Sequence, residues 1–106
     1  MNTYFVYITT ADEAEAKRIA RAVVEARLAA CANVMGSIQS VYRWEGKVCE
    51  DNEVALILKT SEERKAELVD RVKQLHSYNT PCIACLPITA GNPGFMEWIA
   101  DETRPQ

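Results

Sequence analysis

Hydrophobic and polar residues follow two different periods along this chain, and the periods predict strands and helices. Residues 3–9 are aromatic or β-branched almost throughout, which is typical of a strand. The next stretch, Thr10-Ala11-Asp12-Glu13, has the hydroxyl and carboxylate groups of a capping box. From there to Leu28, apolar residues recur every three or four positions with charged residues between them. That spacing predicts a helix with one buried face.

The middle of the chain predicts two strands joined by a tight turn. Residues 37–44 and 48–59 are the strands, and Glu45-Gly46-Lys47 is the turn, where glycine supplies the positive φ of a hairpin bend. The polar run 50–52 interrupts the second of these strands and predicts a bulge there.

The last part of the chain predicts helix, strand and helix. Thr60-Ser61-Glu62-Glu63 reads as a second capping box, and the helix that it opens has a buried stripe of Leu68, Val69, Val72 and Leu75. Residues 82–88 predict a strand, and a short terminal helix carries Phe95, Trp98 and Ile99.

The predicted order is β-α-β-β-α-β, followed by a short C-terminal helix. It is the split βαβ arrangement of ferredoxin-like α+β folds, with one domain over residues 1–106. Right-handed crossovers then place both long helices on one face of an antiparallel sheet.

Three of the predicted strands are apolar on consecutive positions: residues 4–8, 54–58 and 82–86. A sheet with one face in water should alternate apolar and polar residues instead. Two helices cover only one face, and a short terminal helix is too small to cover the other. We therefore expect another copy of the chain to cover it, as a homo-oligomer.

Composition and charge narrow the function classes. Hydrophobic residues at 48% and charged residues at 25% are typical of a folded globular domain. The net charge of −3 argues against a nucleic-acid-binding protein, which usually presents a basic face. No apolar run approaches the roughly 18 residues of a membrane span, and no basic stretch precedes an apolar segment at the N-terminus. We expect a cytoplasmic protein whose four cysteines are reduced.

Several chemistries found on this topology lack the residues they need here. The first strand-to-helix loop, Thr9-Thr10-Ala11-Asp12, has neither the cysteines of a metal chaperone nor the arginine of an acylphosphatase. The aliphatic third strand lacks the exposed aromatic residues of an RNA-recognition sheet. The four cysteines do not form the dense run of a bacterial iron–sulfur protein.

The cysteines are interpreted as packing residues. Cys82 and Cys85 form a C-x-x-C, but in a strand rather than at a helix N-terminus, and residues three apart in a strand point to opposite faces. Cys31 follows an alanine-rich helix end, and Cys49 lies on an exposed strand segment, so neither carries a redox signal.

Four other residues are candidates for binding. His76 either completes the C-terminus of the second long helix, where a cation is favoured, or ligates a metal with the help of Glu50, Asp51 or Glu53. Tyr42 and Trp44 near the hairpin tip suit a subunit contact or a ligand pocket. Lys59, beside a helix N-terminus, is either part of an anion site or a solvated side chain.

The chain resembles the CutA family of divalent-cation tolerance proteins over nearly its whole length. The blocks that carry the resemblance are Leu28-Ala29-Ala30-Cys31-Ala32-Asn33, Tyr42-Arg43-Trp44-Glu45-Gly46-Lys47, residues 53–60, His76-Ser77-Tyr78-Asn79-Thr80-Pro81 and residues 91–98. The resemblance implies a ferredoxin-like subunit in a tight homotrimer. It also implies a cleft between subunits like that of the PII signalling proteins, with matching positions at Cys31, Tyr42, Trp44, Glu53, Lys59, Thr60, His76, Tyr78 and Trp98.

One block departs from the family pattern. The family usually reads His-Pro-Tyr-Glu-x-Pro-Glu where this chain has residues 76–82, so both acidic positions are neutral, as Asn79 and Cys82. Loss of the carboxylates should weaken binding of a hard cation, and the thiol should favour a softer ion such as copper(I) or zinc. We expect His76 and Cys82 to be the metal ligands.

The resulting expectation is a trimer that acts in metal homeostasis and binds copper, zinc or a small anion at subunit clefts. No nucleophile–base pair is recognisable in the sequence, so we expect no catalysis. Two alternatives stay open: a PII-like signalling scaffold that docks a protein partner, and an enzyme that uses Lys59, His76 and Tyr78 in the same cleft. We expect no nucleic-acid or membrane partner.

Overall fold

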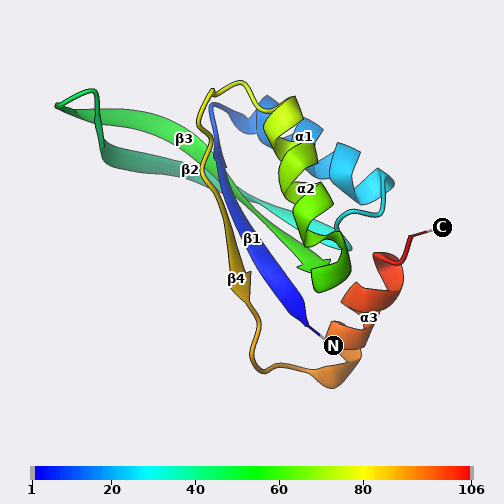
Figure 1. Ribbon diagram of the computed structural model, residues 1–106. Helices are drawn as coiled ribbons and strands as arrows, with labels where there is room; N and C mark the ends of the chain where they lie inside the picture. The colour runs from blue at the N-terminus through cyan, green and yellow to red at the C-terminus, as the bar shows by residue number, and fades with distance from the viewer. Residues whose placement is uncertain (1, 106) are drawn as a thin grey trace.

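The computed structural model describes residues 2–105 and has the predicted α+β architecture. The elements follow the order β1 (Thr3–Thr10), α1 (Glu13–Glu25), β2 (Cys31–Trp44), β3 (Lys47–Ser61), α2 (Glu62–Leu75), β4 (Ile83–Pro87) and α3 (Pro93–Glu102). The four strands form an antiparallel sheet in the order β2-β3-β1-β4. Figure 1 shows α1 and α2 side by side on one face of this sheet, with α3 at one end. No helix in residues 2–105 is long and apolar enough to cross a membrane.

The core lies between the sheet and the two long helices. Val6 and Ile8 of β1 pair with Leu58 and Leu56 of β3, and all four side chains are fully buried. Helix α1 adds Ile19 and Val23 to the same cluster, and Leu68 and Val72 come from α2. The predicted helical stripes therefore face the sheet.

The other face of the sheet is also rich in apolar residues, as predicted. Strand register places Phe5 beside Leu86, and Tyr7 between Ile57 and Ala84. Phe5 and Leu86 are exposed, although both are large hydrophobic side chains. Because α1 and α2 lie on the opposite face, this face has no helical layer over it (Figure 1).

The hairpin formed by β2 and β3 projects well beyond the rest of the molecule (Figure 1). With the hairpin included, the molecule measures 43 × 26 × 22 Å. The hairpin turn has Glu45 and Gly46 at φ values of 50° and 79°, both in the left-handed region. Two consecutive positive φ values are typical of a type I′ hairpin turn, in which glycine carries no steric cost. Glycine at position 46 is thus required by the turn that the sequence predicted.

The predicted bulge is wrong in position. Residues 50–52 pair regularly with β2, whereas the register shifts between Val34 and Ser37, in β2 itself. Met35 and Gly36 together lie opposite the single residue Ala55 of β3, so β2 has one extra residue there, and β2 begins at Cys31 rather than at residue 37. The polar run 50–52 is instead explained by exposure, because it lies on the projecting part of the hairpin.

Helix boundaries differ from the predictions for local reasons. The N-cap of α1 is Asp12, whose Oδ1 accepts from the Glu15 amide at 2.8 Å, so the carboxylate of the predicted capping segment caps the helix and the Thr10 hydroxyl does not. Ser61 is the N-cap of α2 but makes no side-chain capping bond. Its Oγ accepts from Thr103 instead, which ties α3 to the sheet.

Helix α1 ends at Glu25, three residues before the predicted end. The Leu28 amide donates to the Val23 carbonyl and the Arg27 amide to the Val24 carbonyl, which together form a Schellman motif. Arg27 occupies the left-handed position of the motif, at φ 60°. Glycine is the usual residue there, so the helix end carried no recognisable sequence signal.

Candidate functional site

A cavity of about 920 Å³ lies where the projecting hairpin meets the body of the protein. Strand β1, both strands of the hairpin and the loop between α2 and β4 form its walls. Five residues predicted from the sequence line this cavity: Tyr42, Trp44, Glu53, Tyr78 and Cys82. They are up to 40 positions apart in the sequence, and the hairpin and the loop bring them together.

Two carboxylates of the cavity each accept a hydrogen bond from a tyrosine. Tyr78 Oη donates to Glu53 Oε2 at 2.9 Å, and Tyr42 Oη donates to Asp51 Oδ2. The bond to Asp51 raises the pKa of Tyr42 to about 12. Burial, followed by the bond to Glu53, raises the pKa of Tyr78. Both phenols therefore stay protonated and remain donors at neutral pH.

The imidazole of His76 is buried next to Tyr78, with ring centroids 4.7 Å apart. Its Nε2 lies 2.8 Å from the Thr9 carbonyl oxygen, which can only accept, so the proton is on Nε2. Its Nδ1 accepts from the Tyr78 amide at 3.1 Å. Both nitrogens of the neutral ring are thus engaged.

His76 occupies the C-cap position of α2, which was one of the two roles considered for it. The ring, however, bonds to β1 and to its own loop rather than to the last carbonyls of the helix. The imidazole therefore joins the α2–β4 loop to β1 and orients Tyr78 toward the cavity. As a metal ligand, it would first have to give up one of its two hydrogen bonds.

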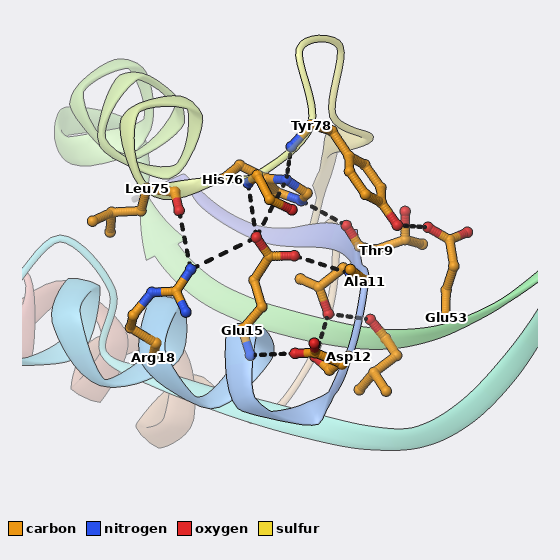
Figure 2. A network of polar contacts seen from close by, with 12 residues as sticks. Thr9, Ala11, Asp12, Glu15, Arg18, Glu53, Leu75, His76 and Tyr78 are labelled. Carbon is orange, nitrogen blue, oxygen red and sulfur yellow. Dashed lines mark hydrogen bonds and ion pairs between the residues drawn. The ribbon is translucent and has the colours of Figure 1, made fainter.

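Behind His76 lies Glu15, a buried carboxylate that the sequence analysis did not single out (Figure 2). Its Oε1 accepts from the Ala11 amide at 2.9 Å and its Oε2 from the Ser77 amide at 2.7 Å. Arg18 Nη2 lies 3.7 Å from Oε2. Glu15 thereby connects the start of α1 to the loop that carries Tyr78.

The surroundings of Glu15 favour its ionised form. Burial alone would raise its pKa, but the hydrogen bonds from Ala11 and Ser77 outweigh burial, so the pKa is lowered. The sequence did contain a signal for this role. Glu15 is the third residue of α1, a position at which an acidic side chain commonly accepts from a backbone amide that precedes the helix.

The remaining predicted site residues lie elsewhere on the chain. Cys31 and Trp98 line a second groove, of about 730 Å³, together with residues of α1. The Lys59 ammonium donates to Asn33 Oδ1 and lies 5.7 Å from the centre of the Phe5 ring. Thr60 is buried and donates to the Leu28 carbonyl oxygen at 2.7 Å. One chain therefore does not bring all nine predicted cleft positions together.

The two cysteines of the C-x-x-C differ in environment. Cys82 is exposed and lines the cavity, so the packing interpretation does not hold for it. Cys85 pairs with Val6 on the helix-covered face, and burial raises the pKa of its thiol. All four cysteines are free.

A complete metal site is not formed by one chain. Within residues 2–105, no three His, Cys, Asp or Glu side chains gather in a group that could hold a metal ion. The carboxylates of Asp51 and Glu53 each accept one bond from a tyrosine and keep a second oxygen, whereas both nitrogens of His76 are engaged. The donors of a single chain therefore do not fit a resident metal, and further donors would have to come from another molecule.

Comparison with known proteins gives one consistent answer. The family model described as CutA1 divalent ion tolerance protein matches residues 4–102. The divalent-cation tolerance protein CutA of Archaeoglobus fulgidus is 48% identical over 99 residues, which are 93% of this chain and 95% of that protein. The protein of the same name from Thermus thermophilus is 45% identical over 98 residues, which are 92% of this chain and 95% of the Thermus protein.

Solved structures agree with the sequence comparison. The structure of the periplasmic divalent cation tolerance protein CutA from Archaeoglobus fulgidus has a TM-score of 0.92 at 44% identity, and the match covers 96% of this chain and 99% of that one. The Cut A1 structure from Thermus thermophilus has a TM-score of 0.94 at 43% identity, with the same coverage. The resemblance inferred from the sequence blocks is therefore confirmed, and this chain belongs to the CutA1 divalent ion tolerance family.

Proposed function

We propose that this protein acts in tolerance of divalent metal ions as a cytoplasmic homotrimer that binds its ligand in clefts between subunits. The observation that carries the proposal is the division of the predicted cleft residues. Tyr42, Trp44 and Glu53 belong to one cavity, whereas Cys31 and Trp98 belong to a second groove on the same chain. A cleft that uses both sets needs two subunits, one contributing each part.

The sheet supports this assembly. Phe5 and Leu86 are exposed side by side on the face opposite the helices, and Val41 and Val48 are exposed on the hairpin. Fully burying one such side chain contributes about 1.5–3 kcal/mol, so a second copy that covers several of them is strongly favoured. Large exposed apolar side chains that neighbour one another, as Phe5 and Leu86 do, are typical of protein interfaces.

The charge of the larger cavity favours a cation over the small anion that was also considered. Asp51 and Glu53 line it, and neither Lys nor Arg is among its lining residues in the described part of the chain. Lys59, the proposed anion-binding residue, already donates to Asn33. We therefore propose copper or zinc as the metal, with the Cys82 thiol as one donor and the second subunit completing the set. His76 joins the ligands only if its ring releases Thr9 or Tyr78.

Isothermal titration of copper(I), zinc and magnesium against the wild type, Cys82→Ser and Glu53→Gln tests this proposal. We expect zinc or copper to bind more tightly than magnesium, and each substitution to weaken binding about tenfold or more. Glu50→Gln is the matched control, because Glu50 lies on the same hairpin outside the cavity. Absence of metal uptake by an intact trimer would instead favour the signalling scaffold that docks a protein. Turnover that Tyr78→Phe abolishes would favour the enzyme.

A further inference from the structure

The walls of the 920 Å³ cavity combine aromatic rings with carboxylates. Tyr7, Tyr42, Trp44 and Tyr78 all line it, together with Asp51 and Glu53. A bare metal ion would occupy a small part of such a volume and would make no use of the rings. Aromatic faces attract organic cations, and they do so more strongly where water is excluded.

Glu53 is placed to receive a hydrogen-bond donor from a ligand. The residue is 9% exposed, and one carboxylate oxygen accepts from Tyr78. Among the contacts of residues 2–105, no donor is found for the other oxygen, which Figure 2 shows directed away from Tyr78. That oxygen is not sealed off by the protein, so a donor group of a ligand in the cavity can reach it.

The tyrosines restrict what the ligand can be. Tyr42 and Tyr78 both donate to the carboxylates, and their raised pKa values keep the phenols neutral. The cavity therefore retains the negative charge of two acids with no cationic side chain lining it in the described part of the chain. Anionic ligands are disfavoured by this charge, and a neutral ligand leaves it uncompensated.

We propose that this cavity binds a small organic cation with a guanidinium head. A planar guanidinium stacks on an aromatic face while its N–H groups donate in pairs to a carboxylate, which a compact ammonium or a quaternary ammonium does not do. Trp44 supplies the stacking face, Glu53 accepts from the head, and Asp51 adds attraction. The proposal rests on this cavity being a ligand cleft, as proposed above, and is independent of the metal.

Ethylguanidinium is a suitable probe, and ethylurea is its neutral counterpart of the same shape. The chain has two tryptophans, and Trp98 lies in the second groove, so Trp98→Phe leaves Trp44 as the only tryptophan. In that background we expect saturable quenching of Trp44 fluorescence by ethylguanidinium and none by ethylurea. Glu53→Gln should weaken binding about tenfold, because a charge-assisted bond becomes a neutral one.

Glu50→Gln, on the same hairpin, should bind ethylguanidinium as the wild type does. Asp51→Asn is the second cavity variant, for use if Glu53→Gln changes the circular dichroism spectrum or the mass of the protein. Equal binding of ethylurea, equal weakening by Glu50→Gln, or no saturable response would overturn the proposal. Zinc titration of the same samples separates the two ideas: zinc uptake without an ethylguanidinium response overturns this inference only, and the reverse result overturns the metal site only.

Discussion

At the scale of single residues, the structure assigns roles by hydrogen bonding rather than by residue type. His76 was singled out because it is the only histidine, yet its ring joins β1 to the α2–β4 loop. Glu15 was one of 15 acidic residues and received no role, yet it holds the same loop from the other side. Sequence position does not reveal which of many acids is buried, because burial is decided by segments distant in the chain.

The stability of the protein should depend on pH through Glu15. Its folded pKa is lowered, so its contribution to stability is present above the ordinary glutamate pKa and is lost as pH falls through the folded value. Glu15→Gln should flatten the acid limb of the stability curve. At neutral pH it should cost about 1–3 kcal/mol, since one backbone amide loses its acceptor. Urea unfolding of both proteins between neutral and acid pH measures the effect.

Glu97→Gln is the control for this measurement, since Glu97 is exposed on α3. Its acid limb should follow that of the wild type. If Glu15→Gln loses stability in acid as steeply as the wild type, the carboxylate of Glu15 is not the linked group.

Thr60 offers a second test at this scale. Its buried hydroxyl donates to the Leu28 carbonyl oxygen, so Thr60→Val keeps the shape and removes the donor. We expect a loss of about 1–2 kcal/mol in the free energy of unfolding. Thr89→Val, at an exposed loop position, should change it little. Chemical denaturation of the two variants at one fixed protein concentration measures the free energy of unfolding of each. An equal loss in Thr60→Val and Thr89→Val would argue against a structural role for the Thr60 hydroxyl.

At the scale of elements, helical periodicity predicted the helices and runs of β-forming residues predicted the strands, and local chemistry decided where they end. The apolar spacing of residues 16–28 continues past the end of α1 because Leu28 packs in the core as part of the cap rather than as a helical turn. The bulge at Met35 and Gly36 likewise reflects how β2 fits β3. Glycine inside a strand can indicate a bulge, but the predicted strand began only at residue 37.

Arg27 allows the cap of α1 to be tested. It holds a left-handed conformation, and its guanidinium donates to the carbonyl oxygens of Asp101 and Arg104 at the end of α3. Both Arg27→Ala and Arg27→Gly lose these bonds, but only glycine relieves the backbone strain. We expect the glycine variant to be more stable than the alanine variant by about 1 kcal/mol. Identical denaturation midpoints would show that the left-handed conformation costs nothing here.

At the scale of the whole molecule, the apolar sheet face is the dominant feature. Leu86→Lys places a charge on this face at the edge strand β4, beside Phe5. We expect it to shift the protein toward an 11.9 kDa monomer, because a buried unpaired charge costs several kcal/mol per subunit. Gln74→Lys, exposed on α2, adds the same charge on the helical side and should leave assembly unchanged. Light scattering at micromolar concentration measures both, and a monomeric wild type would contradict the prediction.

Much of this protein follows from its sequence alone. Helical periodicity and runs of β-forming residues together determine the order of elements, because each segment favours the element that buries its apolar side chains. The consecutive apolar residues of three strands likewise predicted an apolar second face. Residue blocks spread along the chain identified the family, which the comparisons confirm.

Tertiary structure decided how the candidate residues are grouped. Tyr42, Glu53 and Tyr78 share a cavity, whereas Lys59 and Thr60 are engaged within the body and Cys31 lies in another groove. Neighbours in a strand point to opposite faces, and a hairpin brings distant residues together, so proximity in the sequence does not indicate proximity in the site. The register between strands and the path of the α2–β4 loop determine which donors meet, and both depend on packing across the whole molecule.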